Sequence, residues 1–178
     1  MQAVPHPEDV LPGTEVEATV GAWIDAIGAG GGLAAVAECS DAECESLYTL
    51  GYGLYARGRH AEAVQIFGFL VLLRSLEPRF VFSLAACLQA LGRYADAIDH
   101  YATALVIDAE NPAPLLHLSE CLVALRHFEQ ARESLATLSA EYPAAEFPEM
   151  AAKAARLSRL VEREEVHFEE VHSPGSMP

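Results

Sequence analysis

The segment GRHAEA at residues 58–63 returns as GRYADA at residues 92–97 and as RHFEQA at residues 126–131. Each copy lies 34 residues after the one before, and the same offset aligns apolar and small residues on both sides. The aligned triplets are Leu47/Val81/Leu115, Leu50/Leu84/Leu118, Gly51/Ala85/Ser119, Leu54/Leu88/Leu122, Ala63/Ala97/Ala131 and Phe67/Tyr101/Leu135. A fixed period of this length indicates a repeat architecture, in which each supersecondary unit buries its apolar face against the next.

The period and the pattern are typical of the tetratricopeptide repeat (TPR), a pair of helices joined by a turn. The small residues of the triplet Gly51/Ala85/Ser119 would let the two helices of a repeat approach closely. Gly58 and Gly92 would end first helices in the left-handed conformation. Pro78 and Pro112 would open the following repeats, where a missing N–H costs little. We therefore predict an all-α TPR superhelix of three tandem repeats, with an N-terminal helix and a C-terminal capping helix.

The helix boundaries follow from the register and from capping signals. Ser40 and Glu43 form a capping-box pattern at the start of the first repeat helix. The predicted helices cover residues 41–57, 61–76, 79–91, 95–108, 113–125, 129–141 and 148–164. The predicted segments are a flexible tail (1–13), a helical segment with a Gly-rich break (14–40), three repeats (41–143, divided at about 44–77, 78–111 and 112–143), a capping helix (144–165) and a flexible acidic tail (166–178).

A further amphipathic helix is predicted at residues 15–27, and the glycine-rich run at residues 28–32 would end it. Its apolar residues recur at helical spacing. They are Val16, Val20, Trp23, Ile24 and Ile27.

Charge and hydrophobicity limit the partners of the chain. The net charge is −15 and Lys153 is the single lysine, so we expect no direct binding of nucleic acid, which relies on basic side chains. The longest apolar run, residues 66–73, is about half of the roughly 18–20 residues that span a bilayer. The first ten residues lack the basic and apolar regions of a secretory signal. We expect a cytosolic protein without stable membrane association.

No catalytic, cofactor or metal site is predicted. The sequence lacks a P-loop, GxSxG, HExxH or a dinucleotide-binding glycine motif in its strand–turn–helix context. His167 and His172 stand among glutamates at a spacing that suits no helical face, which favours a solvated acidic tail over a metal site. The cysteines form no CxxC pair, and we expect reduced, mostly buried thiols. They are Cys39, Cys44, Cys87 and Cys121.

A binding groove is predicted on the first helices of the repeats, which line the inside of a TPR superhelix. Tyr48, Tyr52 and Tyr55 lie at i, i+4 and i+7, on one helical face beside the core stripe. They are interpreted either as ordinary core or rim residues, or as the aromatic wall of a ligand groove, and we favour the second. The predicted groove residues are Tyr48, Tyr52, Tyr55, Phe82, Arg79, Gln89, Leu116 and Glu120.

Arg79 is the lone cation among the inner positions, where TPR modules that bind acidic C-terminal tails carry several basic residues. An acidic peptide is therefore a poor ligand for this surface. An extended apolar segment of a partner protein is a better one.

Three stretches resemble a known family: residues 31–67, with a GG-x-L turn and LYTLGY; residues 78–105, beginning PRF; and residues 112–131, with SECL. The sequence resembles the class II chaperones of bacterial type III secretion, which escort hydrophobic pore-forming translocators. His60 and Arg126 depart from the family's usual Tyr and Gly. The resemblance covers about residues 31–139.

The resemblance implies a chaperone whose groove holds an extended N-terminal translocator segment, keeping the client soluble, apart and competent for secretion. It also implies a homodimer formed through the N-terminal helices, with Val20, Trp23, Ile24 and Ile27 as candidate interface residues. The alternative is a general TPR scaffold or assembly factor unrelated to type III secretion. An enzyme is not expected, because the repeats occupy most of the chain.

Overall fold

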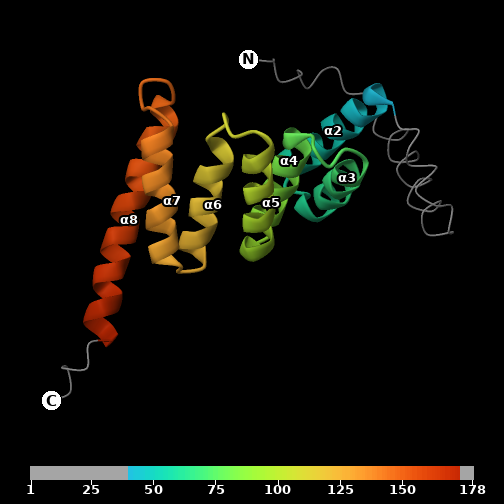
Figure 1. Cartoon of the computed structure of the whole chain (residues 1–178). Coiled ribbons are helices and arrows are strands. Elements are labelled where there is room, and N and C mark those ends of the chain that lie inside the picture. The colour runs from blue at the N-terminus through green and yellow to red at the C-terminus, as the bar shows by residue number, and fades with distance from the viewer. Residues whose placement is uncertain (1–39, 173–178) are drawn as a thin grey trace. The chain divides into compact units, whose positions relative to one another are not determined.

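The computed structural model describes residues 40–172, with side chains up to residue 164 (Figure 1). Within these residues the structure contains seven α-helices and no strand. The helices are α2 (Asp41–Ala56), α3 (His60–Leu73), α4 (Pro78–Ala90), α5 (Tyr94–Ile107), α6 (Ala113–Ala124), α7 (Phe128–Glu141) and α8 (Pro148–His172). The helix predicted at 15–27, with Val20, Trp23, Ile24 and Ile27, lies outside the described residues.

The chain divides into two compact units, with the boundary between Gly92 and Arg93. This boundary falls inside the second predicted repeat, between its two helices. In unit 1, α3 packs against both α2 and α4, and α2 contacts α4. In unit 2, α5, α6, α7 and α8 lie side by side in chain order, and α8 also contacts α6 (Figure 1). No helix within residues 40–172 is both long and apolar enough to span a membrane.

Apart from the C-terminal end of α8, the helix boundaries agree with the predicted ones to within a few residues, and the capping box is confirmed. The Ser40 N–H donates to the Glu43 carboxylate at 2.8 Å, and the Glu43 N–H donates to Ser40 Oγ at 3.3 Å. These hydrogen bonds, led by the side chain of Ser40, lower the pKa of Glu43. The capping residues therefore satisfy backbone donors that the first turn of α2 leaves unpaired.

Two helices end differently from the prediction. Helix α3 ends at Leu73 rather than residue 76, since the backbone leaves the helical conformation at Arg74, which has φ −138° and ψ 72°. Helix α8 continues to His172, past the predicted end at residue 164 and into the segment predicted as a flexible tail. No Gly or Pro interrupts residues 149–173, and the Glu and Arg residues there are good helix formers.

The turns after the first helices have a left-handed residue at equivalent positions. Gly58 and Gly92 have φ angles of 75° and 74°, as predicted, and Arg126 has a φ of 62°. The left-handed region costs a residue with a Cβ about 1–2 kcal/mol, whereas glycine adopts it readily. Unit 2 therefore carries backbone strain at Arg126 that the equivalent turn of unit 1, at Gly58, avoids.

Substituting Arg126→Gly is expected to raise the free energy of unfolding by about 0.5–1 kcal/mol, because it relieves this strain. The lost contacts of Arg126 are weak: an exposed pair with Glu164 at 3.8 Å and a ring contact with Phe128 at 6.0 Å. Urea unfolding measures the change. Arg126→Ala is the control, since it removes the side chain and keeps the strain. Equal stability of the Gly and Ala variants would contradict the interpretation.

Small residues allow close packing of the two helices of a repeat, as predicted from their alignment at one repeat position. Gly51, Ala85 and Ser119 are all buried. A Cβ added to Gly51 would lie 2.8 Å from Cζ of Phe67 and 3.2 Å from Cγ2 of Ile66. Phe67 is fully buried and has little room to move. The first repeat therefore packs α2 on α3 more closely than a residue with a Cβ at position 51 permits.

Gly51→Ala is expected to lower the free energy of unfolding by about 1–2 kcal/mol, since overpacking outweighs the better helix propensity of alanine. The loss should shrink in a Phe67→Leu background, because leucine is the residue at the equivalent position 135. A double-mutant cycle measured by urea unfolding tests this coupling. Additive effects of the two substitutions would show that the ring of Phe67 does not limit the space for a Cβ at position 51.

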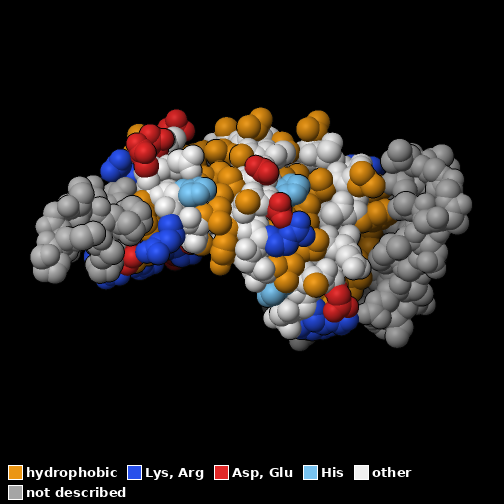
Figure 2. All heavy atoms as spheres, turned by 90° about the horizontal axis from the view of Figure 1, so that it is seen from below, with side chains coloured by type: hydrophobic (Ala, Val, Ile, Leu, Met, Phe, Trp, Pro, Cys, Tyr) orange, Lys and Arg blue, Asp and Glu red, His pale blue; other side chains and the backbone are white. Residues whose placement is uncertain are grey.

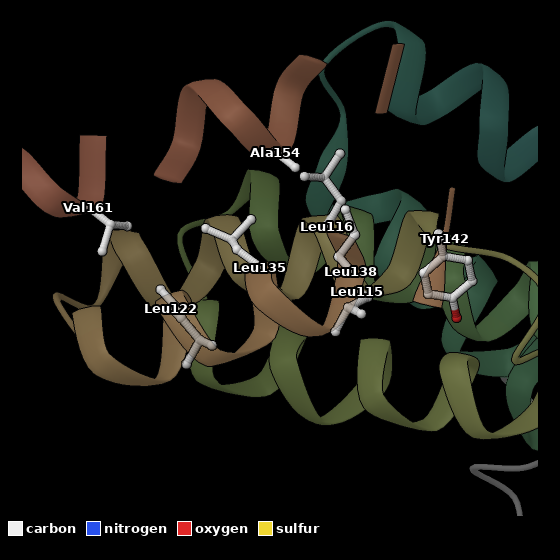
Figure 3. Close-up of a cluster of buried hydrophobic side chains, with 9 residues drawn as sticks. Leu115, Leu116, Leu122, Leu135, Leu138, Tyr142, Ala154 and Val161 are labelled. Carbon is white, nitrogen blue, oxygen red and sulfur yellow. The ribbon is translucent and has the colours of Figure 1, made fainter. Parts of the chain in front are cut away.

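The core of unit 2 combines side chains from α6, α7 and α8 (Figure 3). Ala154 and Val161 of α8 are 2% and 1% exposed and pack with leucines of α6 and α7. Tyr142 closes one end of this core, and its hydroxyl donates to the Ala109 carbonyl at 2.7 Å. Helix α8 therefore covers the last repeat and buries an apolar face that would otherwise be open to solvent.

Candidate functional site

The predicted groove residues divide between the two units. Tyr48, Tyr52 and Tyr55 come from α2, and Arg79, Phe82 and Gln89 come from α4, all in unit 1. Leu116 and Glu120 come from α6, in unit 2. The part of the candidate site in unit 1 thus rests on the first helices of two successive repeats, which contact each other.

Arg79 is held by two carboxylates of unit 1. Its guanidinium donates two hydrogen bonds to the Glu45 carboxylate, at 3.0 and 3.2 Å, and one to Glu77 at 3.0 Å. The hydrogen bonds to Glu45 are the largest cause of a rise in the pKa of Arg79. Glu45 and Arg79 occupy the same position of successive repeats, 34 residues apart. The predicted lone cation of the groove is therefore neutralised within the protein.

Tyr48 belongs to an aromatic contact between α2, α3 and α4. Its ring centroid lies 5.8 Å from that of Phe67 and 5.7 Å from that of Phe80. The Arg79 guanidinium lies over the Tyr48 ring, 5.3 Å from its centroid. Tyr48 is half-buried as a result. Tyr48 therefore fits the interpretation as a core or rim residue better than that as a wall of a ligand groove, because much of its ring packs inside the unit.

Tyr52 and Tyr55 are more accessible. Tyr52 is 51% exposed, and Tyr55 is half-buried with its ring 5.0 Å from that of His60. The hydroxyls of Tyr48, Tyr52 and Tyr55 have no hydrogen-bond partner among the residues that the structure describes. A tyrosine that exposes its ring and hydroxyl can bind an apolar side chain and a backbone group of a ligand together. Phe82 and Gln89, on α4, are half-buried.

Further large hydrophobic side chains of unit 1 are exposed to solvent. Figure 2 shows hydrophobic side chains reaching the surface between charged ones. The exposed ones in unit 1 are Tyr52, Leu72, Leu76 and Leu91.

The prediction that Leu116 lines an open groove is wrong. Leu116 is 2% exposed and belongs to the core of unit 2 (Figure 3). The physical reason is α8, which packs on α6 and covers this face of the last repeat. The alignment with Tyr48 and Phe82 is correct, but α8 lies next to the last repeat and stands outside the repeating pattern.

Glu120 is half-buried on α6 and interacts with His117, one turn earlier in the same helix. Its carboxylate lies 3.0 Å from Nδ1 of His117, and the His117 ring stacks on Tyr101 at 5.5 Å. These contacts fix the carboxylate against α5. Glu120 therefore contributes a positioned negative charge to the surface of α6.

Cys87 and Cys121 lack the character of catalytic or metal-binding thiolates. Like Cys44, they are buried and in no disulfide, as predicted, and burial raises the pKa of both Cys87 and Cys121 to about 12. Thiols with such pKa values are protonated at neutral pH and are poor nucleophiles. Cys39 lies outside the described residues. Between residues 40 and 164 no cluster of His, Cys, Asp and Glu is arranged to hold a metal ion.

Comparison with known proteins agrees with the repeat geometry. Two tetratricopeptide repeat profiles match residues 48–112 and 88–157, which confirms the predicted all-α TPR fold. No curated protein matches the chain. Among solved structures, a type III secretion system complex from Aeromonas hydrophila is 36% identical, with a TM-score of 0.67. The match covers 81% of this chain and 97% of that one.

The Yersinia enterocolitica type III secretion chaperone SycD, solved with a peptide of the translocator YopD, is 30% identical. The match covers 72% of this chain and 98% of SycD, with a TM-score of 0.64. The chain belongs to the type III secretion translocator chaperones. PcrH from Pseudomonas aeruginosa, a further member, is 31% identical over 73% of this chain and 99% of its own, with a TM-score of 0.65. The family resemblance of the sequence is thereby confirmed.

Two members of this family were solved with pieces of their clients. SycD was crystallised with a YopD peptide, and PcrH with the chaperone binding regions of PopD and of PopB. SycD is also described as an alternative dimer.

Sequence reasoning missed the carboxylates that neutralise Arg79 and the ring of Phe80 beside Tyr48. The 34-residue offset between Glu45 and Arg79 was the signal for the first pair, because equivalent positions of adjacent first helices are neighbours. Nothing in the sequence signals the orientation of Phe80 toward Tyr48.

Proposed function

We propose that this protein is a cytoplasmic bacterial chaperone that binds an extended apolar segment of a type III secretion translocator along α2 and α4, the first helices of its first two repeats. The observation that carries the proposal is the match to nearly the whole of SycD, a chaperone that was solved with a translocator peptide. Bound segments would be shielded from premature association and from membranes until they are released for secretion.

The proposed activity is binding without turnover, so the protein acts as neither an enzyme nor a cofactor-dependent protein. Tyr52 and Tyr55 would supply ring surface for spaced apolar side chains of the client. Their hydroxyls would bond its backbone, which an extended segment leaves unpaired. A homodimer is part of the proposal, on the analogy of the SycD dimer.

The charge of the surface favours a segment without acidic side chains near α2. Glu45 and Glu77 occupy the hydrogen-bonding edges of the Arg79 guanidinium. A client carboxylate would have to displace one of them and would approach a chain of net charge −15. Apolar and neutral side chains face no such barrier.

The test uses the full-length protein and two fluorescein-labelled peptides, the YopD peptide that was solved with SycD and the chaperone binding region of PopD. We expect saturable binding with a dissociation constant in the micromolar range or tighter, measured by fluorescence anisotropy. Peptides of the same composition in scrambled order are the control. A folded protein that binds the scrambled peptides as tightly, or binds none of them, would contradict a chaperone function and favour the general scaffold.

Freeing Arg79 is expected to change peptide preference. Glu45→Gln removes one of its two carboxylate partners, so a YopD peptide with a glutamate substituted at one apolar position should bind several-fold tighter to the variant than to the natural protein. The double variant Glu45→Gln/Arg79→Gln should lose this gain, because the guanidinium that would bind the glutamate is absent. A gain that survives in the double variant would show that reduced charge repulsion, and not Arg79, is responsible.

A further inference from the structure

An apolar depression lies in unit 2, between α5 and α7, with α6 as its floor. Its volume is about 560 Å³. Leu118 and Leu122 of α6 and Leu125, the C-cap residue that follows α6, line it at spacings of i, i+4 and i+7, and Ile98 of α5 joins them. We call this depression the α5–α7 groove. Residues spaced in this way share one face of a helix, so the floor is a continuous apolar strip about two turns long.

Both walls of the α5–α7 groove carry a carboxylate. Asp99 projects from α5 and Glu133 from α7, and both residues are exposed. Neither carboxylate takes part in an ion pair with any described residue. By contrast, the neighbouring Asp96 is paired with Arg93 at 2.6 Å. The α5–α7 groove therefore combines an apolar floor with two carboxylates that form no ion pair with a Lys, Arg or His side chain within residues 93–164.

The α5–α7 groove is separate from the site proposed for the translocator segment. Glu120 and Val123 occupy the face of α6 opposite to Leu118 and Leu122, as follows from the 3.6-residue period. A ligand in the groove and a ligand on the other face of α6 would thus contact different residues.

The charge of the chain argues against occupants from within it. A second copy carries a net charge of −15. Residues 1–39 contain six acidic and no Lys or Arg residues, and residues 173–178 contain no charged side chain. Nucleic acids and anionic lipids would be repelled by the same carboxylates. The complementary ligand is apolar on one side and basic beside it.

We propose that the α5–α7 groove binds a basic amphipathic helix of a partner protein. Apolar side chains one turn apart on that helix would pack between Leu118, Leu122 and Leu125, as in other complexes of a helix in a groove. Lys or Arg side chains flanking them would pair with Asp99 on one wall and Glu133 on the other. The groove would give the chaperone a second partner while a client occupies α2 and α4.

The experiment uses the full chain and two fluorescein-labelled 14-residue helical peptides. One contains leucines at helical spacing with lysines elsewhere, and the other has glutamate in place of lysine. We expect the Leu/Lys peptide to bind in the micromolar range at about 0.15 M salt, where long-range attraction is screened, and the Leu/Glu peptide not to bind. The Leu/Lys peptide should not compete with the YopD peptide.

Variants locate the binding. Asp99→Asn/Glu133→Gln should weaken binding of the Leu/Lys peptide at least fivefold. Thr137→Lys, at an exposed position in the lining of the groove, should weaken binding as well. The control Glu110→Gln/Glu129→Gln removes the same charge from exposed residues outside the groove and should change affinity less than twofold. Equal losses in both double variants, or unchanged binding by Thr137→Lys, would overturn the proposal in favour of unspecific attraction. Binding of the Leu/Glu peptide would overturn it as well.

Discussion

Replacing both Tyr52 and Tyr55 by alanine is expected to weaken binding of a translocator peptide about ten- to a hundredfold, while the midpoint of thermal unfolding changes by less than about 2 °C. Tyr52 is 51% exposed, and Tyr55 makes its one ring contact in the described part of the chain with His60. Neither side chain contributes to the buried core. Their removal therefore costs little stability and takes away contact area that a ligand would use.

Tyr48 is expected to behave differently, because its ring packs against Phe67 and Phe80. Truncating it would lower stability as well as affinity, so Tyr48→Ala cannot separate the two roles. Tyr52→Phe/Tyr55→Phe is the matched control for the alanine pair. It keeps both rings and removes both hydroxyls. The loss of peptide affinity should be smaller than for the alanine pair, since a neutral hydrogen bond contributes about 0.5–1.5 kcal/mol.

Anisotropy titration with the YopD peptide measures affinity, and differential scanning calorimetry measures stability. If the alanine pair binds the peptide as the natural protein does, the tyrosines are not part of the binding surface. If the variant instead unfolds at a much lower temperature, the tyrosines are structural, and the proposed site in unit 1 is wrong.

Val161→Asp is expected to lower the free energy of unfolding by more than about 3 kcal/mol, enough to abolish the cooperative unfolding transition of unit 2. Val161 is 1% exposed in the core that α6, α7 and α8 share. A carboxylate there would be buried without a partner, one of the most costly substitutions that a protein core can receive. Detachment of α8 is the expected response, and it would expose Leu116 and the leucines around it.

Ala155→Asp is the control, because it adds the same charge at an exposed position of the same helix. Circular dichroism during urea unfolding compares the two variants. We expect Ala155→Asp to stay within about 0.5 kcal/mol of the natural protein. A Val161→Asp variant as stable as that control would show that α8 is not needed to complete the fold of unit 2.

The repeat fold was predictable because its signals are local and repeated. The 34-residue register placed the buried Leu47, Ala63 and Phe67, and the capping box of Ser40 marked the start of α2. The length of α8 was not predictable to the same degree. Its sequence from residue 162 on is charged, and either a solvated helix or a coil satisfies such a composition.

The site was predictable only in part, because a residue's role depends on its neighbours in space. The TPR register and helical spacing together predicted an accessible face of α2 for Tyr52 and Tyr55, and Tyr52 is exposed there while Tyr55 is half-buried. Leu116 was misplaced because its burial depends on α8, which lies outside the repeating pattern. The ion pairing of Arg79 depends on Glu45, one repeat away, and becomes visible only when the contact between α2 and α4 is known.

The buried thiols divide between the units, with Cys44 and Cys87 in unit 1 and Cys121 in unit 2. A thiol-specific reagent can reach each of them only when the surrounding helices separate, since folded-state reactivity is suppressed by burial. Labelling rates of the individual cysteines, measured by mass spectrometry, would therefore report the opening rates of the two units separately. The natural cysteines would thus report, without any engineered probe, which half a bound client protects.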